Sequence, residues 1–357
     1  MLAIVPDAFG GRGGIAQYNR DFLGAVADSG IVSQVIILPR SAPDPYTAPP
    51  NIHQLTPRRS KLAYTSFALR TALLWRVDVV FCGHLFMASL AALIARLKNA
   101  KLIVQTHGIE AWPRPRPRQC SAVDSADLVL SVSRHTRAAV LSWAAIDPAR
   151  VIVLPNTVRS QFTPGDGSKM RAALGLEGKR VLLTVARMDS QHRYKGQDLM
   201  IAAVPWLVAR GHDVHYLIAG DGDDRPRLEA LARKKRVTNR VHFLGPVPFR
   251  QLKDFYRAAD LYVMPSTGEG FGIAFLEAMA TGIPALGLNI GGARDVLADG
   301  ELGACVAESD FVNAVHHALI SQKPDPITLA ASAQTRFGRD GFGFGVRSVL
   351  NRLRETA

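Results

Sequence analysis

Short aliphatic runs alternate along this chain with longer segments in which apolar residues recur every three or four positions. The short runs predict buried strands, and the longer spacing predicts amphipathic helices, as at residues 15–26 and 134–143. The predicted strands occupy residues 2–5, 35–38, 77–82, 101–105, 128–132 and 151–154, and then residues 181–185, 214–219, 241–244, 261–264 and 284–288. Strands and helices in this alternation predict an α/β fold built on parallel sheets.

The alternation stops at the turn-rich segment 162–167 and then begins again. With 357 residues, the chain is too long for one ordinary hydrophobic core and suits two domains. We therefore place a domain boundary near residue 164. A last amphipathic helix is predicted at residues 344–355.

The composition is that of a globular, loop-rich protein, with 48% hydrophobic residues, 30 glycines and 21 prolines. The wide spacing of Cys82, Cys120 and Cys305 argues against a disulfide framework, a zinc site or a redox pair, and it favours a reducing, cytoplasmic compartment. The opening residues lack the basic lead and cleavage site of a signal peptide. The most apolar stretch, residues 79–95, is shorter than the roughly 20 residues that cross a bilayer.

The net charge of +13 is concentrated in the first half of the chain. Residues 1–165 hold 18 Lys and Arg against 9 Asp and Glu, a net charge of +9, and the remaining residues hold 25 against 21, a net charge of +4. This asymmetry predicts a polyanionic partner, which could be nucleic acid, an anionic membrane surface or a phosphorylated substrate. No recognised nucleic-acid-binding motif accompanies the charge, so we expect no nucleic acid partner.

Two basic elements in the first half suit an anionic partner. Residues 57–76 contain five basic and no acidic side chains among aromatic and aliphatic ones, which is typical of a helix at an anionic membrane surface. The alternative is a domain helix whose basic face is merely solvated. In residues 112–118, prolines alternate with Arg114, Arg116 and Arg118, and we expect them to hold the three arginines extended toward an anionic acceptor.

An acidic pair marks the strongest candidate site. Glu269 lies on a glycine turn after the strand predicted at 261–264, and Glu277 lies eight positions later on the helix that the turn opens. Gly270 and Gly272 leave backbone amides accessible at the helix start, where phosphate oxygens bind, and a carboxylate can accept hydrogen bonds from sugar hydroxyls. Strand, turn and helix together place the pair at the carboxyl end of a parallel sheet, where open α/β sheets bind ligands. Two ordinary helix-start glutamates are the alternative.

Two cations are predicted at the same edge of the same sheet. Arg187 follows the first strand of the second half, and Lys195 follows eight residues later. Each alone could be a solvated loop charge, but beside the acidic pair their expected target is a diphosphate.

A glycine turn near the start of the chain permits a different function. Gly11, Gly13 and Ala16 satisfy the dinucleotide fingerprint G-x-G-x-x-G/A, which would suit an NADP-dependent oxidoreductase. However, the glycines begin several residues after the strand, and Arg40 follows the second strand where NAD enzymes carry an acidic residue. Arg40 is compatible with NADP, so this reading stays as the alternative.

The order of these motifs along the chain resembles the retaining glycosyltransferase family 4, and the resemblance covers nearly the whole sequence. The matching segments are the glycine pair near the start, Thr106-His107-Gly108, Pro155-Asn156, Arg187, Lys195-Gly196, Ala219-Gly220-Asp221-Gly222, Phe243-Leu244-Gly245 and Glu269 to Glu277. The resemblance implies the GT-B fold, in which two facing Rossmann-like domains have a cleft between them. It implies an acceptor-binding domain at residues 1–164, a nucleotide-sugar-binding domain at residues 165–340, and a C-terminal helix at residues 341–357 that packs back on the first domain.

The resemblance also implies roles for individual residues. The expected catalytic residues are His107, Arg187, Lys195 and Glu269. The expected donor-binding residues are Gly13, Gly14, Arg187, Lys195, Leu244, Glu269, Gly270, Phe271, Gly272 and Glu277. The expected acceptor-binding residues are Glu110, Arg114 and Arg116.

The function implied by the resemblance is transfer of a hexose, with retention, from a UDP- or GDP-linked sugar to a sugar acceptor. The basic elements favour a lipid-linked intermediate of polysaccharide or lipopolysaccharide synthesis, with the enzyme peripheral on the inner face of the cytoplasmic membrane. Asp221-Gly222-Asp223 matches a D-x-D metal motif in form, but its place between a strand and a helix predicts a turn. We therefore expect no metal ion and no other cofactor.

Overall fold

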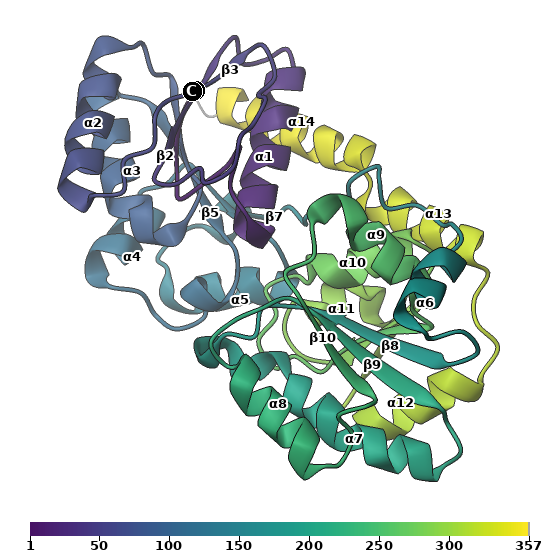
Figure 1. Ribbon diagram of the computed structural model, residues 1–357. Helices are drawn as coiled ribbons and strands as arrows, with labels where there is room; N and C mark the ends of the chain where they lie inside the picture. Colours follow the sequence, from purple (N-terminus) through teal and green to yellow (C-terminus); the bar gives the residue numbers. More distant parts are fainter. Residues whose placement is uncertain (356–357) are drawn as a thin grey trace. The chain divides into compact units, whose positions relative to one another are not determined.

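The aliphatic runs form the strands of two parallel sheets in the computed structural model, which describes residues 1–355 (Figure 1). The strands of the first sheet are β1 (Leu2–Val5), β2 (Val35–Pro39), β3 (Ile52–Gln54), β4 (Val79–Cys82), β5 (Lys101–Thr106), β6 (Leu128–Ser131) and β7 (Val151–Val153). Those of the second sheet are β8 (Arg180–Val185), β9 (Val214–Ala219), β10 (Val241–Gly245), β11 (Leu261–Met264), β12 (Ala285–Leu288) and β13 (Ala304–Val306). The strand orders are β3-β2-β1-β4-β5-β6-β7 and β10-β9-β8-β11-β12-β13.

Helices cover both sheets. The first sheet is accompanied by α1 (Gly13–Asp28), α2 (Lys61–Leu74), α3 (Ala88–Lys98), α4 (Pro117–Asp124), α5 (Arg134–Trp143) and α14 (Arg339–Glu355). The second is accompanied by α6 (Ser168–Leu174), α7 (Gln197–Ala209), α8 (Arg225–Lys234), α9 (Phe249–Ala258), α10 (Ile273–Ala280), α11 (Ala293–Val296), α12 (Phe311–Ile320) and α13 (Pro326–Phe337). Short 3₁₀ segments lie between these elements at η1 (Leu85–Met87), η2 (Ile109–Ala111), η3 (Pro148–Arg150), η4 (Ser190–Lys195), η5 (Ala298–Gly300) and η6 (Glu308–Asp310). Every residue of β1, β6, β11 and β12 is buried, as expected for strands covered on both faces.

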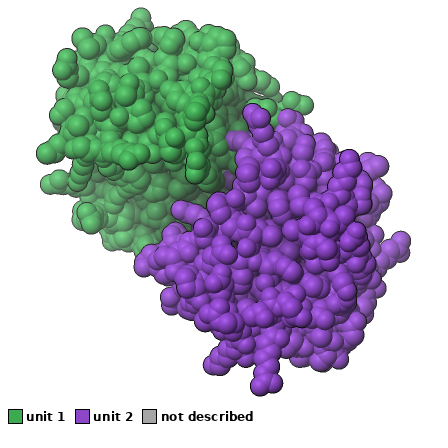
Figure 2. Space-filling model, in the orientation of Figure 1, with its two compact units in different colours: residues 1–157, 339–357 green, residues 158–338 purple. Residues whose placement is uncertain are grey.

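The chain divides into two compact units, residues 1–157 with 339–357 and residues 158–338, coloured separately in Figure 2. The division at residue 157 comes earlier than the sequence-based boundary near residue 164. Phe162 explains the difference, because it is fully buried and its ring contacts those of Phe249 and Tyr256 in the second unit. The Arg257 side chain also donates to the Thr163 carbonyl at 2.9 Å.

The last helix belongs to the first unit. α14 begins at Arg339 and packs against α1, with the Phe342 and Tyr18 ring centroids 6.0 Å apart. Residues 356 and 357 of the helix expected at 341–357 lie outside the described part of the chain.

In both sheets, the direction in which strands are added reverses beside a central strand. β1 lies between β2 and β4, and β8 lies between β9 and β11. Loops that leave the carboxyl ends of strands at such a reversal diverge to opposite sides, and ligands of open α/β sheets bind there. No helix within residues 1–355 is both long and apolar enough to cross a membrane.

Candidate active site

Two loops meet at the carboxyl edge of the second sheet. The cation loop, residues 186–196, follows β8, and the glutamate loop, residues 265–272, follows the neighbouring strand β11. The Thr267 amide donates to the Tyr194 carbonyl at 2.9 Å. The Tyr194 ring lies so close to Gly268 that a Cβ there would be 2.8 Å from it. A backbone hydrogen bond therefore joins the two loops independently of their charged side chains.

An ion pair between Lys195 and Glu269 joins the same two loops. Lys195 Nζ lies 2.6 Å from Glu269 Oε2, and the side chains are only 20% and 13% exposed. Gly196 makes the approach possible, because its φ of +75° and the Pro265 carbonyl, 2.4 Å from an added Cβ, leave room for glycine alone. Burial, with a further contribution from the negative charge of Glu269, raises the pKa of Tyr194 to about 12. The structure thus brings together two residues that lie 74 positions apart in the chain.

The other predicted residues of this edge lie in different environments. Arg187 is exposed, whereas Glu277 is 5% exposed and accepts a hydrogen bond from Tyr256 Oη at 2.8 Å. Phe271 is 3% exposed and its ring contacts Phe337, so only its backbone can face a ligand. Leu244 is half-buried in β10.

The turn before α10 brings backbone groups close together. Gly272 precedes the helix with φ +100°, and the carbonyl of Gly270 lies 2.0 Å from a Cβ built on Gly292. The Gly292 amide donates to the Glu269 carbonyl at 2.7 Å. The backbone that carries Glu269 is therefore fixed from both sides.

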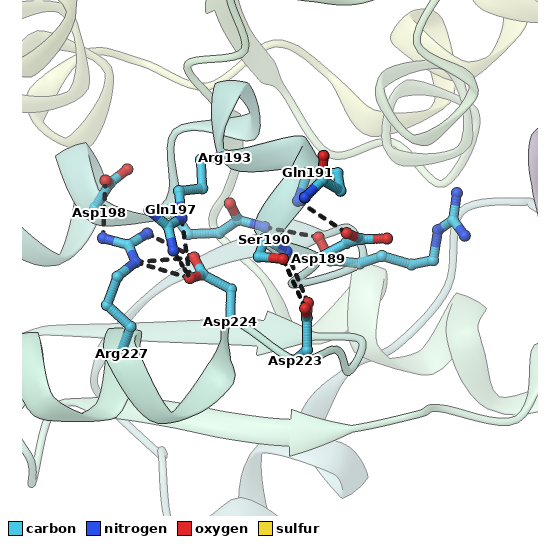
Figure 3. Close-up of polar contacts among 10 residues, drawn as sticks. Asp189, Ser190, Gln191, Arg193, Gln197, Asp198, Asp223, Asp224 and Arg227 are labelled. Carbon is cyan, nitrogen blue, oxygen red and sulfur yellow. Dashed lines mark hydrogen bonds and ion pairs between the residues drawn. The ribbon is translucent and has the colours of Figure 1, made fainter.

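A third loop holds the cation loop in place (Figure 3). This aspartate loop, residues 220–224, follows β9 and contains the D-x-D sequence noted above. The Asp223 carboxylate accepts from the Ser190 amide at 2.7 Å and from Ser190 Oγ at 2.6 Å. A Cβ on Gly222 would lie 2.0 Å from the Met188 carbonyl, so the two backbones are in close contact.

Asp224 is the buried member of this loop. It is 4% exposed and accepts hydrogen bonds from Arg193 Nε at 3.0 Å and from an Arg227 guanidinium nitrogen at 2.6 Å. Figure 3 shows its carboxylate between the two arginines. Hydrogen bonds from Arg227 first, and from Arg193, hold the pKa of Asp224 below its usual range. Asp223 and its neighbour Asp224 therefore bind protein groups, and no group of three or more metal-ligand side chains occurs within residues 1–355.

His107 lies at the corresponding edge of the first sheet, after β5. Its backbone amide donates to Glu110 Oε1, and its Nε2 lies 2.9 Å from the Gly83 carbonyl. Because a carbonyl only accepts, Nε2 carries the proton, and Nδ1 of the neutral ring is left as an acceptor. Burial lowers the pKa of His107, against the opposing effect of the Glu110 charge. The ring is also held edge-on against Tyr18, with centroids 5.3 Å apart.

His84, which the sequence analysis did not single out, stands beside His107. Their ring centroids are 5.8 Å apart, and His84 Nδ1 accepts from the Phe86 amide at 3.3 Å. The neutral His84 ring therefore carries its proton on Nε2, and burial lowers its pKa to about 4. A histidine two residues after β4, the strand beside β5, was a signal available in the sequence. Together the two rings offer an acceptor at His107 Nδ1 and a donor at His84 Nε2, a pair that suits hydroxyl groups.

The arginines of residues 112–118 are only partly as expected. Arg114 and Arg116 are exposed outside the helix, but Arg118 lies in the first turn of α4 and does not extend with them. Pro117 occupies the first helical position, where its fixed φ favours a helix, and Gln119 caps the turn through the Arg116 amide. The expectation of three extended arginines was therefore wrong for Arg118.

Gly13 and Gly14 begin α1, and both are exposed. Gly13 has φ +85°, a conformation that favours glycine at this helix start.

Comparison with known proteins identifies two matching family descriptions. Residues 12–162 match "Glycosyltransferase Family 4", and residues 166–334 match "Glycosyl transferases group 1". A GDP-mannose-dependent alpha-(1-6)-phosphatidylinositol monomannoside mannosyltransferase of Mycolicibacterium smegmatis is 31% identical over 269 residues, which are 71% of this chain and 69% of that protein. D-inositol 3-phosphate glycosyltransferase of Gordonia bronchialis is 33% identical over 260 residues, 69% of this chain and 54% of that protein. The chain thus spans about half the length of several such relatives.

Solved structures share the fold over the whole chain. Anabaena Alr3699/HepE in complex with UDP has a TM-score of 0.78 at 20% identity, covering 98% of this chain and 99% of that one. WaaG, a glycosyltransferase involved in lipopolysaccharide biosynthesis, has a TM-score of 0.66 at 20% identity, with the same coverage. These likenesses confirm the predicted GT-B fold class with two Rossmann-like domains.

The buried carboxylate of Asp224 yields a stability prediction. Asp224→Asn removes the charge that holds Arg193 and Arg227, and we expect the free energy of unfolding to fall by about 1–3 kcal/mol. Urea denaturation measures it. The matched control is Asp78→Asn, whose 70% exposed carboxylate pairs with an exposed arginine, Arg76, and the change should alter the value by no more than about 0.5 kcal/mol. Equal effects of the two variants would contradict the assigned role of Asp224.

The depressed pKa of His84 yields a pH prediction. Between the unfolded value of 6.5 and the folded value of about 4, the unfolded chain binds a proton that the folded chain does not. The free energy of unfolding should therefore rise with pH across this window, by up to roughly 3 kcal/mol from this group. His84→Gln should reduce the rise measured by denaturation at a series of pH values, leaving the part due to His107, and an unchanged slope would show that His84 contributes nothing to it.

Proposed function

This chain belongs to glycosyltransferase family 4, and we propose that it transfers a hexose from a nucleotide diphosphate sugar to a sugar acceptor with retention of configuration. The observation that carries the proposal is the Lys195–Glu269 pair at the carboxyl edge of the second sheet, where the cation loop is bonded both to the glutamate loop and to the aspartate loop. A fixed cation beside a fixed carboxylate suits a ligand that contains both a diphosphate and sugar hydroxyls.

The donor would be bound mainly by residues of the second unit. Arg187 and Lys195 would contact the diphosphate, Glu269 the transferred sugar and Glu277 the ribose, with Tyr256 fixing the Glu277 carboxylate. The turn Gly270 to Gly272 would present backbone groups, Leu244 would border the base, and Gly13 and Gly14 would complete the phosphate contacts. Both a UDP- and a GDP-linked hexose are candidates, since one similar structure contains UDP and one relative is a GDP-mannose-dependent mannosyltransferase.

The chemistry follows from where charge develops. Cleavage of the anomeric C–O bond builds positive charge on the sugar and negative charge on the departing diphosphate. Arg187 and Lys195 would stabilise that negative charge, and preorganised cations are among the largest contributions to catalysis. His107 would contact the transferred sugar, and the lowered pKa of its ring keeps a second positive charge away from that sugar. No metal ion is required in this scheme, because the side chains of Asp223 and Asp224 bind Ser190, Arg193 and Arg227.

The acceptor would be a lipid-linked intermediate of polysaccharide or lipopolysaccharide synthesis, reached from the inner face of the cytoplasmic membrane. Glu110, Arg114 and Arg116 would contact it. Support comes from the exposed, positively charged Arg114 and Arg116 and from the mannosyltransferase relative, whose name specifies a phosphatidylinositol-linked substrate. The alternative was an NADP-dependent oxidoreductase, based on Gly11, Gly13 and Ala16. Membership of a glycosyltransferase family argues against it.

A panel of nucleotides tests the donor class. We expect UDP or GDP, and the corresponding sugar nucleotide, to raise the thermal midpoint of the purified chain in the presence of EDTA, because a ligand that binds only the folded state stabilises it. ADP, dTDP, NAD and NADP are the comparison ligands. A shift with NADP alone would overturn the proposal in favour of the oxidoreductase.

Variants of the ion pair test the site. Lys195→Ala and Glu269→Ala should each lower sugar transfer by about a hundredfold to a thousandfold while leaving a folded protein. Lys179→Ala is the matched control, because Lys179 also pairs with a carboxylate, Asp213, but precedes β8 at the opposite edge of the sheet. NMR of the product gives its anomeric configuration. Full activity in either site variant, or an inverted product, would refute the assignment.

A further inference from the structure

Helix α2 has an unusual outward face. It lies on the outside of the first unit beside α3 (Figure 1), and its inward side chains Tyr64, Ala68 and Ala72 belong to the core of that unit. Tyr64 Oη also donates to the Leu38 carbonyl at 2.6 Å. The inward face thus attaches the helix to its unit, and the outward side chains are exposed to a binding partner.

Large apolar side chains occupy that outward face. Leu62, Leu73 and Leu74 are 81%, 74% and 79% exposed, and Trp75, which caps the helix, is 39% exposed. Single exposed leucines are normal on protein surfaces, but four large apolar side chains within one helix and its cap indicate a binding surface.

The same segment is positively charged without compensation. Arg58, Arg59, Lys61 and Arg70 are exposed, and none of them forms an ion pair with a carboxylate of residues 1–355. Arg76 pairs with Asp78. Four unneutralised cations beside exposed leucines would attract a negatively charged surface that can also take up apolar groups.

A groove on this helix is lined by both cationic and apolar side chains. It has a volume of about 400 Å³, and its lining includes two cations, Arg58 and Arg70, and two large apolar residues, Phe67 and Leu74. The Arg58 guanidinium lies over the Phe67 ring at 5.2 Å. Such a lining suits an amphiphile that carries a phosphate group and an apolar chain.

We propose that residues 58–76, the α2 surface, dock on a bilayer that contains anionic phospholipid. The arginines would contact lipid phosphates, Trp75 would lie at the interface, and the leucines would enter the acyl boundary. A nucleic acid would satisfy the cations but leave the leucines in water, whereas an anionic bilayer satisfies both. The inference goes beyond the proposed transfer reaction and is measured without it.

The test is co-sedimentation of the full chain with vesicles of phosphatidylcholine alone and of phosphatidylcholine with phosphatidylglycerol. We expect binding to the second kind only, weakened by salt because exposed charges are screened. The variant Arg58→Gln/Arg70→Gln should bind about 25-fold more weakly, at roughly fivefold for each charge. The variant Leu73→Ser/Leu74→Ser should bind at least about tenfold more weakly at unchanged charge.

Matched controls lie on the other unit. Arg233→Gln/Lys234→Gln removes two exposed charges of α8, and Ile327→Ser removes a side chain of α13 that is 71% exposed. Both should bind as the unmodified chain does. Because none of the substitutions changes a core side chain of α2, all variants should have the thermal midpoint and the nucleotide response of the unmodified chain.

Three results would overturn the proposal. One is equal binding to neutral and anionic vesicles or to neither, and another is unchanged binding of both α2 variants. The third is a dimer in solution that becomes monomeric in Leu73→Ser/Leu74→Ser, because the leucines would then cover a second copy of the chain. Loss of nucleotide binding or of transfer in all proteins would refute the proposed function and leave the vesicle result standing.

Discussion

The ion pair between Lys195 and Glu269 depends on the cation loop, which is bonded to the glutamate loop on one side and to the aspartate loop on the other. The glutamate loop and the cation loop share the Thr267–Tyr194 hydrogen bond, and the aspartate loop holds the cation loop from its other side. These contacts involve backbone groups and the buried carboxylate of Asp224. Lys195 is therefore held in position by the protein itself, and no ligand is needed to order it. Such preorganisation is what makes a charged group effective in a closed site.

Most of the fold could be predicted from hydrophobic pattern alone, because buried parallel strands are continuous aliphatic runs. The pattern missed β3 and β13, which have three residues each and lie at sheet edges, where β3 has one buried residue and β13 has none. It also placed the domain boundary late, since Phe162 packs on aromatic side chains far along the chain. Short edge strands and long-range contacts leave little periodic signal.

The candidate site could be predicted in part. Position after a strand was enough to assign Arg187, Lys195, Glu269 and Glu277 to one sheet edge, because parallel strands end together. It could not show that Lys195 and Glu269 pair, or that Asp224 anchors the cation loop, since these contacts join residues that are at least 31 positions apart. The pairing of His84 with His107 was missed for the same reason, although both follow neighbouring strands.

The place of α14 has a consequence for how this chain is made on the ribosome. The second unit is one contiguous segment, whereas the first needs residues from both sides of it. Since chains emerge from the amino terminus onward, the second unit can fold while the first still lacks the helix that packs against α1. The domain begun first is thus completed last, and until then the α1 surface that receives Phe342 lacks its partner helix.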